Sequence, residues 1–167
     1  GFDAKRLFTN FTGLGNHSRN LVNNYHLAFP EDEIVLFTPR ISVDDRTKPF
    51  LNTAYSIFQP KGIAPFWRTF DVIKDIQASG VEIYHGLSHE LPVGISKLDI
   101  GKVVTIHDLI FKYYPEDNKW LDRKVYDLKW KHACKAADII IAVSEQTRQD
   151  LIEFYSVPAE KIEVHYP

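Results

Sequence analysis

The sequence predicts an α/β fold in which helices cover both faces of a mostly parallel sheet. Short, continuous apolar runs alternate with longer segments of helical periodicity, which is typical of parallel strands buried on both faces. With 167 residues, of which 44% are apolar, the chain is long enough for one domain with a substantial core. We therefore expect a three-layer, doubly wound Rossmann-like domain with the strand order 3-2-1-4-5-6.

The first elements follow this alternation. Residues 1–4 are expected to form a strand and residues 5–12 a connecting loop. Apolar side chains between Asn16 and Phe29 fall on one helix face, and the following proline ends that helix. The run "EIVLF" at 33–37 has the continuous apolar character of a buried strand.

Residues 40–65 interrupt the pattern. The segment is rich in Asp and Pro with scattered aromatic residues, which predicts a long excursion with short strand pairs within 50–59. The aromatic side chains suggest a surface on which a sugar ring stacks.

The second half returns to alternating strands and helices. In chain order, we expect a helix at 66–79, strands at 81–85 and 102–108, a helix at 119–137, a strand at 138–144, a helix at 145–155 and a final strand at 161–166. In the longest helix, Leu121, Val125, Leu128 and His132 share one stripe, and Trp120 and Trp130 are candidates to anchor a neighbouring element.

The stretch "TGLGNHSRN" has two glycines, Gly13 and Gly15, just before a helix. A dinucleotide-binding loop would have a third glycine where Ser18 stands and an acidic residue after the second strand, which instead ends "LFTPR". An NAD-dependent oxidoreductase is therefore a weak alternative. Backbone N–H groups at a helix N-terminus favour an anion, so the loop remains a candidate phosphate contact beside the plain reading of a turn.

Polar residues follow several of the predicted strands. His107 and Asp108 end one strand, His85 ends another and is followed by His89, and Ser144 stands between a strand and a helix, where it is also a candidate N-cap. Ligands bind doubly wound sheets where the strand order reverses, at the carboxyl ends of the strands. We therefore expect the glycine loop and His107 to face one crevice. The histidines lack the helical spacing of a zinc site and the chain has no cysteine cluster, so no metal is expected.

The composition argues against other classes of partner. The net charge is −2 and no basic run reaches five residues, which disfavours a nucleic-acid partner. No apolar run approaches the length of a membrane span. The single cysteine, Cys134, cannot form an internal disulfide, which favours a reducing compartment and a role as a small core residue.

Four stretches together resemble the N-terminal domain of a group 1 (family 4) GT-B glycosyltransferase: "TGLGNHSRNL", "VEIYHGLSHELP", "VVTIHDLIFKYYPE" and "ACKAADIIIAVSEQTRQDLIEFYSVPAEKIEVHYP". The resemblance covers most of the chain except residues 40–65. It implies one half of a GT-B fold, in which the N-terminal domain binds mainly the acceptor and a C-terminal domain binds the nucleotide-sugar.

The resemblance also implies roles for individual residues. Gly13, Leu14 and Gly15 would approach the donor phosphates. His107 and Asp108 match the catalytic "HD" pair. The remaining matches, at the cleft or acceptor side, are His85, His89 and Ser144.

The implied enzyme transfers a sugar with retention, without a metal or other cofactor, to a saccharide or lipid-linked acceptor in polysaccharide or glycoconjugate synthesis. Its location would be cytoplasmic, with peripheral association at the inner face of the membrane as one option. Because the paired glutamates of the family belong to the C-terminal domain, residues 1–167 are expected to be the N-terminal domain and to be inactive alone. A non-catalytic sugar- or nucleotide-binding module is the main alternative.

Overall fold

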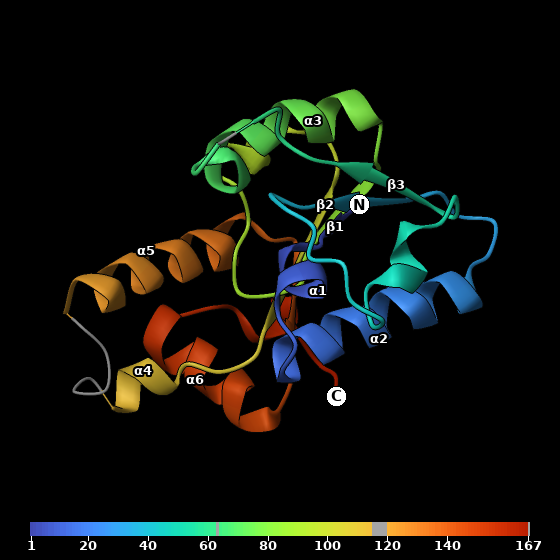
Figure 1. The fold of residues 1–167 in the computed structure, drawn as a ribbon. Helices are drawn as coiled ribbons and strands as arrows, with labels where there is room; N and C mark the ends of the chain where they lie inside the picture. The colour runs from blue at the N-terminus through green and yellow to red at the C-terminus, as the bar shows by residue number, and fades with distance from the viewer. Residues whose placement is uncertain (63, 115–119, 167) are drawn as a thin grey trace.

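A computed structural model describes residues 1–62, 64–114 and 120–166, apart from the side chain of residue 122. Its centre is a seven-stranded sheet in the order β3-β2-β1-β4-β5-β6-β7, and every neighbouring pair is parallel. Helices pack on both sides of this sheet (Figure 1). The predicted α/β, Rossmann-like fold class is confirmed.

The strands are short and mostly buried. They are β1 (Phe2–Asp3), β2 (Ile34–Phe37), β3 (Tyr55–Phe58), β4 (Ile83–Gly86), β5 (Gly101–Ile106), β6 (Ile139–Ala142) and β7 (Ile162–Val164). All four residues of β2 are buried, as its continuous apolar run predicts.

In the part of the chain that the structure describes, six α-helices connect the strands. They are α1 (Lys5–Thr9), α2 (Gly13–Ala28), α3 (Val72–Ser79), α4 (Ile110–Tyr113), α5 (Trp120–Ala136) and α6 (Glu145–Tyr155). A π-helical turn, η2 (Trp67–Asp71), leads into α3, and the 3₁₀ turns are η1 (Lys48–Leu51), η3 (Ile95–Lys97) and η5 (Ala159–Lys161). Helix α6 has the predicted bounds, and Ser144 caps it by accepting a hydrogen bond from the Thr147 N–H at 3.1 Å.

The predicted order 3-2-1-4-5-6 agrees with the first six strands of the sheet, but the segment assigned to the third strand was wrong. The expected third strand, at 81–85, is the fourth in the structure, and it pairs with β1 at the centre of the sheet. The third strand is β3, at 55–58, which extends the sheet beyond β2 as a single parallel strand and not as the expected strand pair. An edge strand is buried on fewer sides, so β3 lacks the continuous apolar run that marks β2 and β6. The order therefore reverses between β1 and β4, one strand away from β5.

The predicted loop at 5–12 was also wrong, because residues 5–9 form helix α1. Leu7 and Phe8 are fully buried there, so tertiary packing stabilises a helix too short to be stable alone. Helix α2 likewise begins at Gly13, three residues before the predicted start at Asn16.

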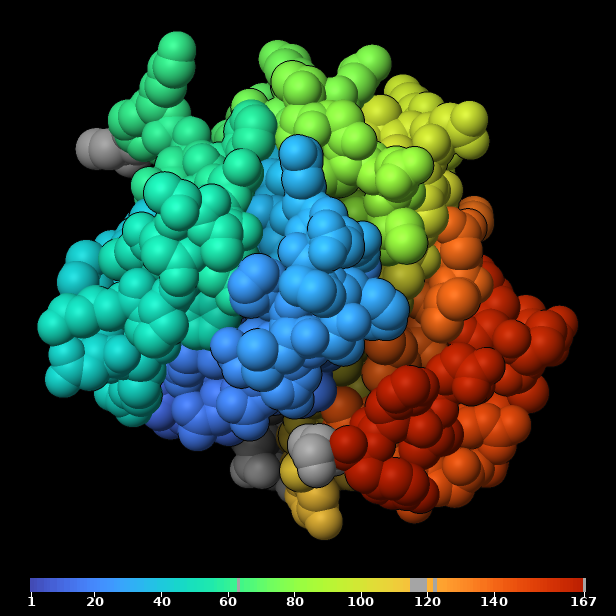
Figure 2. All heavy atoms as spheres, turned by 90° about the vertical axis from the view of Figure 1, so that its right-hand side faces the viewer, coloured from blue at the N-terminus to red at the C-terminus, as the bar shows by residue number. Residues whose placement is uncertain are grey.

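The expected aromatic surface of the 40–65 excursion is not formed by Phe50 and Tyr55. Both side chains are buried in the smaller of two hydrophobic cores, which also contains Leu36. Residues 40–58 lie along α2 on one face of the molecule (Figure 2). The larger core lies among α3, α5, α6 and the strands β4 to β7, and it includes Cys134 as expected.

A buried ion network at the carboxyl end of β1 joins four segments that are distant in the sequence. The Arg68 guanidinium in η2 lies 2.6 Å from a carboxylate oxygen of Asp3 and 2.7 Å from one of Glu90. Lys129 of α5 lies 3.2 Å from the same Glu90 oxygen. The side chain of Arg68 is only 12% exposed and that of Asp3 only 4%, so these charges depend on one another for solvation.

Replacing Arg68 with Ala is expected to lower the free energy of unfolding by about 3 kcal/mol, since it leaves Asp3 buried without a counter-ion and leaves Glu90 with Lys129 alone. Urea denaturation measures the change. The control is Arg46→Ala, which removes an exposed ion pair with Asp44 and is expected to change the free energy of unfolding far less. Equal costs for the two variants would contradict a structural role for the buried network.

Candidate active site

The two glycines lie in the first turn of α2 and have different structural roles. The Gly15 N–H donates a hydrogen bond to Asn10 Oδ1 at 2.9 Å. A β-carbon at Gly15 would lie 1.7 Å from the Asn10 carbonyl oxygen, whereas one at Gly13 would meet nothing within 4 Å. Gly15 therefore allows α1 and α2 to approach closely, and its N–H is already engaged. The predicted phosphate contact is therefore limited to the backbone N–H groups of Gly13 and Leu14. The described residues provide no acceptor for these two groups.

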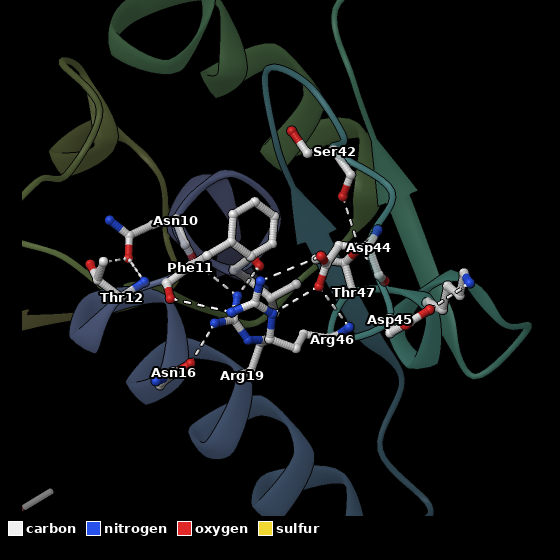
Figure 3. A network of polar contacts seen from close by, with 12 residues as sticks. Asn10, Phe11, Thr12, Asn16, Arg19, Ser42, Asp44, Asp45, Arg46 and Thr47 are labelled. Carbon is white, nitrogen blue, oxygen red and sulfur yellow. Dashed lines mark hydrogen bonds and ion pairs between the residues drawn. The ribbon is translucent and has the colours of Figure 1, made fainter.

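Side chains hold this turn in place (Figure 3). Asn10 Oδ1 also accepts from the N–H and the hydroxyl of Thr12, both at 3.0 Å. Arg19 Nη1 donates to the carbonyl oxygens of Leu7 at 2.8 Å and Asn10 at 2.9 Å, at the end of α1. Residue Arg19 is buried, so these bonds fix the path of the chain into α2.

The excursion contacts the same turn. Arg46 lies over the ring of Phe11, with the guanidinium carbon 4.5 Å from the ring centroid, and it pairs with Asp44 (Figure 3). Within the excursion, the Thr47 hydroxyl donates a hydrogen bond to the Ser42 carbonyl oxygen at 2.8 Å, which holds residues 42–47 in a turn. Residues 42–47 therefore form an ordered flank of the turn.

His107 follows β5 and lies against the first turns of α2. Its ring contacts that of His17 edge-on, with the centroids 4.8 Å apart. Its Nε2 lies 3.0 Å from the carbonyl oxygen of Leu87, and because a carbonyl only accepts, Nε2 carries the proton. Burial lowers the pKa of His107, so the ring is neutral near pH 7, and Nδ1 is free to accept a hydrogen bond. The structure thus brings together the two segments that the sequence placed in one crevice.

His89 lies on the other side of His107. Their ring centroids are 5.2 Å apart, and His89 stacks on Trp130 of α5 at 4.0 Å and an interplanar angle of 10°. Its backbone is left-handed, with φ of 61°, and its N–H donates to the Thr105 carbonyl at 2.9 Å. Burial and the neighbouring His107 lower the pKa of His89 well below its ordinary value. The neutral ring of His89, stacked on Trp130, therefore lies beside His107.

His85 is buried within the sheet at the end of β4. Its Nε2 lies 2.9 Å from the hydroxyl of Thr105, and burial lowers its pKa to about 3. Its predicted contact with an acceptor stays a prediction.

Asp108 and Ser144 flank His107 differently. Asp108 is exposed, and its carboxylate accepts a hydrogen bond from the Ile110 N–H at 3.2 Å. The Ser144 hydroxyl lies 2.9 Å from that of Thr147, which donates to the His107 carbonyl at 3.0 Å. Ser144 therefore connects to His107 through Thr147. The roles predicted for Asp108 and Ser144 at the cleft stay predictions.

Three participants were not predicted from the sequence: His17, the Leu87 carbonyl and Thr147. His17 lies in the stretch "TGLGNHSRN", so its contact with His107 could have been predicted once α2 was placed beside β5. A backbone acceptor such as the Leu87 carbonyl cannot be predicted from the residue type, because every residue has a carbonyl oxygen. Among the described residues, no cluster of three His, Cys, Asp or Glu side chains could hold a metal ion.

Comparison with known proteins adds a family to this geometry. Residues 11–167 match the family model described as Glycosyltransferase Family 4. The O-antigen chain mannosyltransferase B of Escherichia coli is 26% identical over 178 residues, which cover 90% of this chain and 42% of that protein. The chain thus spans less than half the length of this relative.

Replacing Gly15 with Ala is expected to destabilise the fold by about 1–3 kcal/mol, because the added methyl group collides with the Asn10 backbone. The matched control, Gly13→Ala, adds the same group in open space and is expected to leave the free energy of unfolding within about 1 kcal/mol of the parent. Urea denaturation compares the two. A tolerated Gly15→Ala would contradict the close approach of α1 and α2.

The buried histidines make stability depend on pH. In the unfolded chain these histidines bind protons below about pH 6.5. In the folded protein, burial lowers the pKa of His85 to about 3, so that His85 stays neutral where the unfolded chain would bind a proton. The stabilisation is complete above pH 6.5 and is lost as the pH falls, by about 1.4 kcal/mol per pH unit for each such histidine. Urea denaturation between pH 6.5 and pH 5 measures this slope. His85→Gln is expected to reduce the slope by about one histidine, and an unchanged slope would refute the assignment.

Proposed function

This chain belongs to glycosyltransferase family 4, and we propose that it forms the acceptor-side, N-terminal half of a two-domain GT-B enzyme. The full enzyme transfers a sugar from a nucleotide-sugar donor to a saccharide or lipid-linked acceptor, in the synthesis of a polysaccharide or glycoconjugate. The transfer proceeds with retention and without a metal. Mannose is the first donor sugar to test, because the E. coli relative is named a mannosyltransferase.

The observation that supports this proposal best is the contact of His107 with His17, in the second turn of α2 and close to its N-terminus. When the bond between the anomeric carbon and the donor diphosphate breaks, negative charge develops on the leaving nucleoside diphosphate. The unoccupied N–H groups of Gly13 and Leu14 stabilise that charge at a helix N-terminus. The main binding site for the diphosphate belongs to the partner domain.

In the proposed enzyme, the neutral ring of His107 accepts a hydrogen bond from the substrate. Its Nε2–H is bound to Leu87, so its Nδ1 accepts a hydrogen bond from a hydroxyl of the donor sugar. That contact orients the sugar, which suits a reaction that depends on positioning. Asp108 lies next to it at the open edge.

The proposed enzyme is cytoplasmic and associates peripherally with the inner face of the membrane. No helix in the described residues is long and apolar enough to cross a bilayer. The alternative function is a non-catalytic sugar- or nucleotide-binding module, and measured sugar transfer separates the two.

In the full-length enzyme, His107→Ala is expected to lower the turnover number at least 100-fold while changing the free energy of unfolding by less than about 2 kcal/mol. The assay measures release of nucleoside diphosphate from nucleotide-activated mannose and other activated sugars in the presence of an acceptor extract. The 167-residue chain alone is expected to give no transfer.

Two conservative variants make the test sharper. Asn at position 107 keeps an acceptor near the place of Nδ1, whereas Gln keeps a polar group near the place of Nε2. We expect His107→Asn to retain more activity than His107→Gln. Normal turnover in His107→Ala would refute the assignment, and turnover by the isolated chain would refute the two-domain proposal.

A further inference from the structure

Buried polar atoms without partners gather around His107. In the described residues, five buried side-chain nitrogen atoms have no hydrogen-bond partner, and three of them belong to Arg6, His17 and His89. The ring centroids of His17 and His89 lie 4.8 Å and 5.2 Å from that of His107. A buried polar group without a partner is costly, so this concentration indicates a place where a ligand supplies the missing hydrogen bonds.

Arg6 brings a positive charge to this place. It is the second residue of α1, and no carboxylate in the described residues forms an ion pair with it. Burial lowers the pKa of both His89 and His107, and the charge of Arg6 lowers both further. The pKa of His17 is lowered by burial and by His107, without a contribution from Arg6. Arg6 therefore acts on the side of His107 that faces His89, and not on the side that faces α2.

The surrounding charges leave an excess of cations at the start of α1. The carboxylates of Asp3 and Glu90 both pair with Arg68. Lys5 precedes Arg6 and is half-buried, and it too has no ion pair among the described residues. Buried charges are stable only beside opposite charges, so two half-buried cations without counter-ions indicate an anionic ligand. The excess is local, because the whole chain has a net charge of −2.

The chemistry of these groups fits an oxyanion. The planar guanidinium of Arg6 presents paired N–H donors, which suit two oxygens of a phosphate or a carboxylate. His89 is only 7% exposed, and its Nδ1 is one of the unpartnered atoms, so it can contribute a further hydrogen bond in a site that excludes most water. A neutral hydroxyl alone would leave the charge of Arg6 without a counter-ion.

This place differs from the one proposed for the donor diphosphate. The free N–H groups in the first turn of α2 lie on the side of His107 that His17 contacts. Arg6 and His89 lie on the other side, beside the connection between β4 and β5. A reaction centred on His107 would therefore have one anion on each side. Because the donor supplies the first, the second belongs to the acceptor.

We propose that Arg6, together with Lys5 and His89, binds an oxyanion carried by the acceptor, so that the enzyme selects phosphorylated, diphosphate-linked or carboxylated saccharides over neutral ones. The bound anion orients the acceptor, and its hydroxyl then meets the sugar held at His107. Arg6 is thus a substrate-binding residue that determines specificity. The assignment to an acceptor rests on the proposed function, whereas binding of the anion is measured without sugar transfer.

Calorimetric titration of the full-length enzyme tests the anion site. The probes are inorganic phosphate, mannose 6-phosphate and mannose, each added with a nucleoside diphosphate already present to occupy the donor side. We expect both phosphates to bind, and mannose to bind at least tenfold more weakly than mannose 6-phosphate. Equal affinities for mannose and mannose 6-phosphate would overturn the proposal.

Arginine variants locate the bound phosphate. Arg6→Gln should weaken phosphate binding at least tenfold, and Arg6→Lys, which keeps the charge, should restore part of the loss. The matched control, Arg46→Gln, removes an arginine beside the first turn of α2 and should change the affinity less than about twofold. Urea denaturation should show no loss of stability in Arg6→Gln, since the guanidinium has no ion pair in the described residues. Equal losses of affinity in the two Gln variants would overturn the proposal.

Transfer kinetics test the acceptor class. Cell-derived acceptors are separated by anion exchange, and we expect labelled sugar to enter the retained, anionic fraction. Extraction with organic solvent then distinguishes a lipid-linked diphosphate from a water-soluble phosphorylated or carboxylated saccharide. Arg6→Gln should raise the KM for the acceptor at least tenfold and leave the KM for the donor within about twofold. Transfer mainly to neutral acceptors, or an equal rise in both KM values, would overturn the proposal. Absence of transfer to every fraction would refute the proposed function, and the phosphate titration would still decide the anion site.

Discussion

A buried guanidinium holds together the edge of the sheet on which the candidate site depends. Arg68 pairs with Asp3, at the end of strand β1, and with Glu90 in the connection between β4 and β5. That connection supplies both the Leu87 carbonyl that binds His107 and the ring of His89. Burying these charges is costly, and the arrangement is stable because each carboxylate meets the same cation. The position of His107 therefore depends on an ion pair in which His107 takes no part.

The other segments of the site are held in a similar way, by side chains that bond to backbone. Arg19 binds the carbonyls at the end of α1, and Thr147 binds the carbonyl of His107. Such bonds fix the backbone and leave the neighbouring N–H groups and ring nitrogens free for a ligand. A site of this kind suits chemistry in which orientation and electrostatic stabilisation do most of the work.

Helix α5 carries different side chains on its two faces. Its inner face carries Trp130, which stacks on His89, and Lys129, which pairs with Glu90. Its outer face carries the exposed side chains of Leu121, Val125 and Leu128. One face of α5 therefore borders the candidate site, and the other faces solvent.

The sequence by itself determined the fold class, helix α6 and the strands β2, β5 and β6, because buried strands and an N-capped helix depend on local pattern. It also predicted that the glycine segment and His107 lie together, since strand ends share an edge in a parallel sheet, and the contact between the rings of His17 and His107 agrees with this. Only the tertiary structure decided that residues 5–9 are helical, that β3 completes the sheet, and that the Gly15 N–H is occupied by Asn10. These outcomes depend on contacts between segments, as does the outward turn of the α5 stripe, and residue spacing along one segment carries no information about what packs against it.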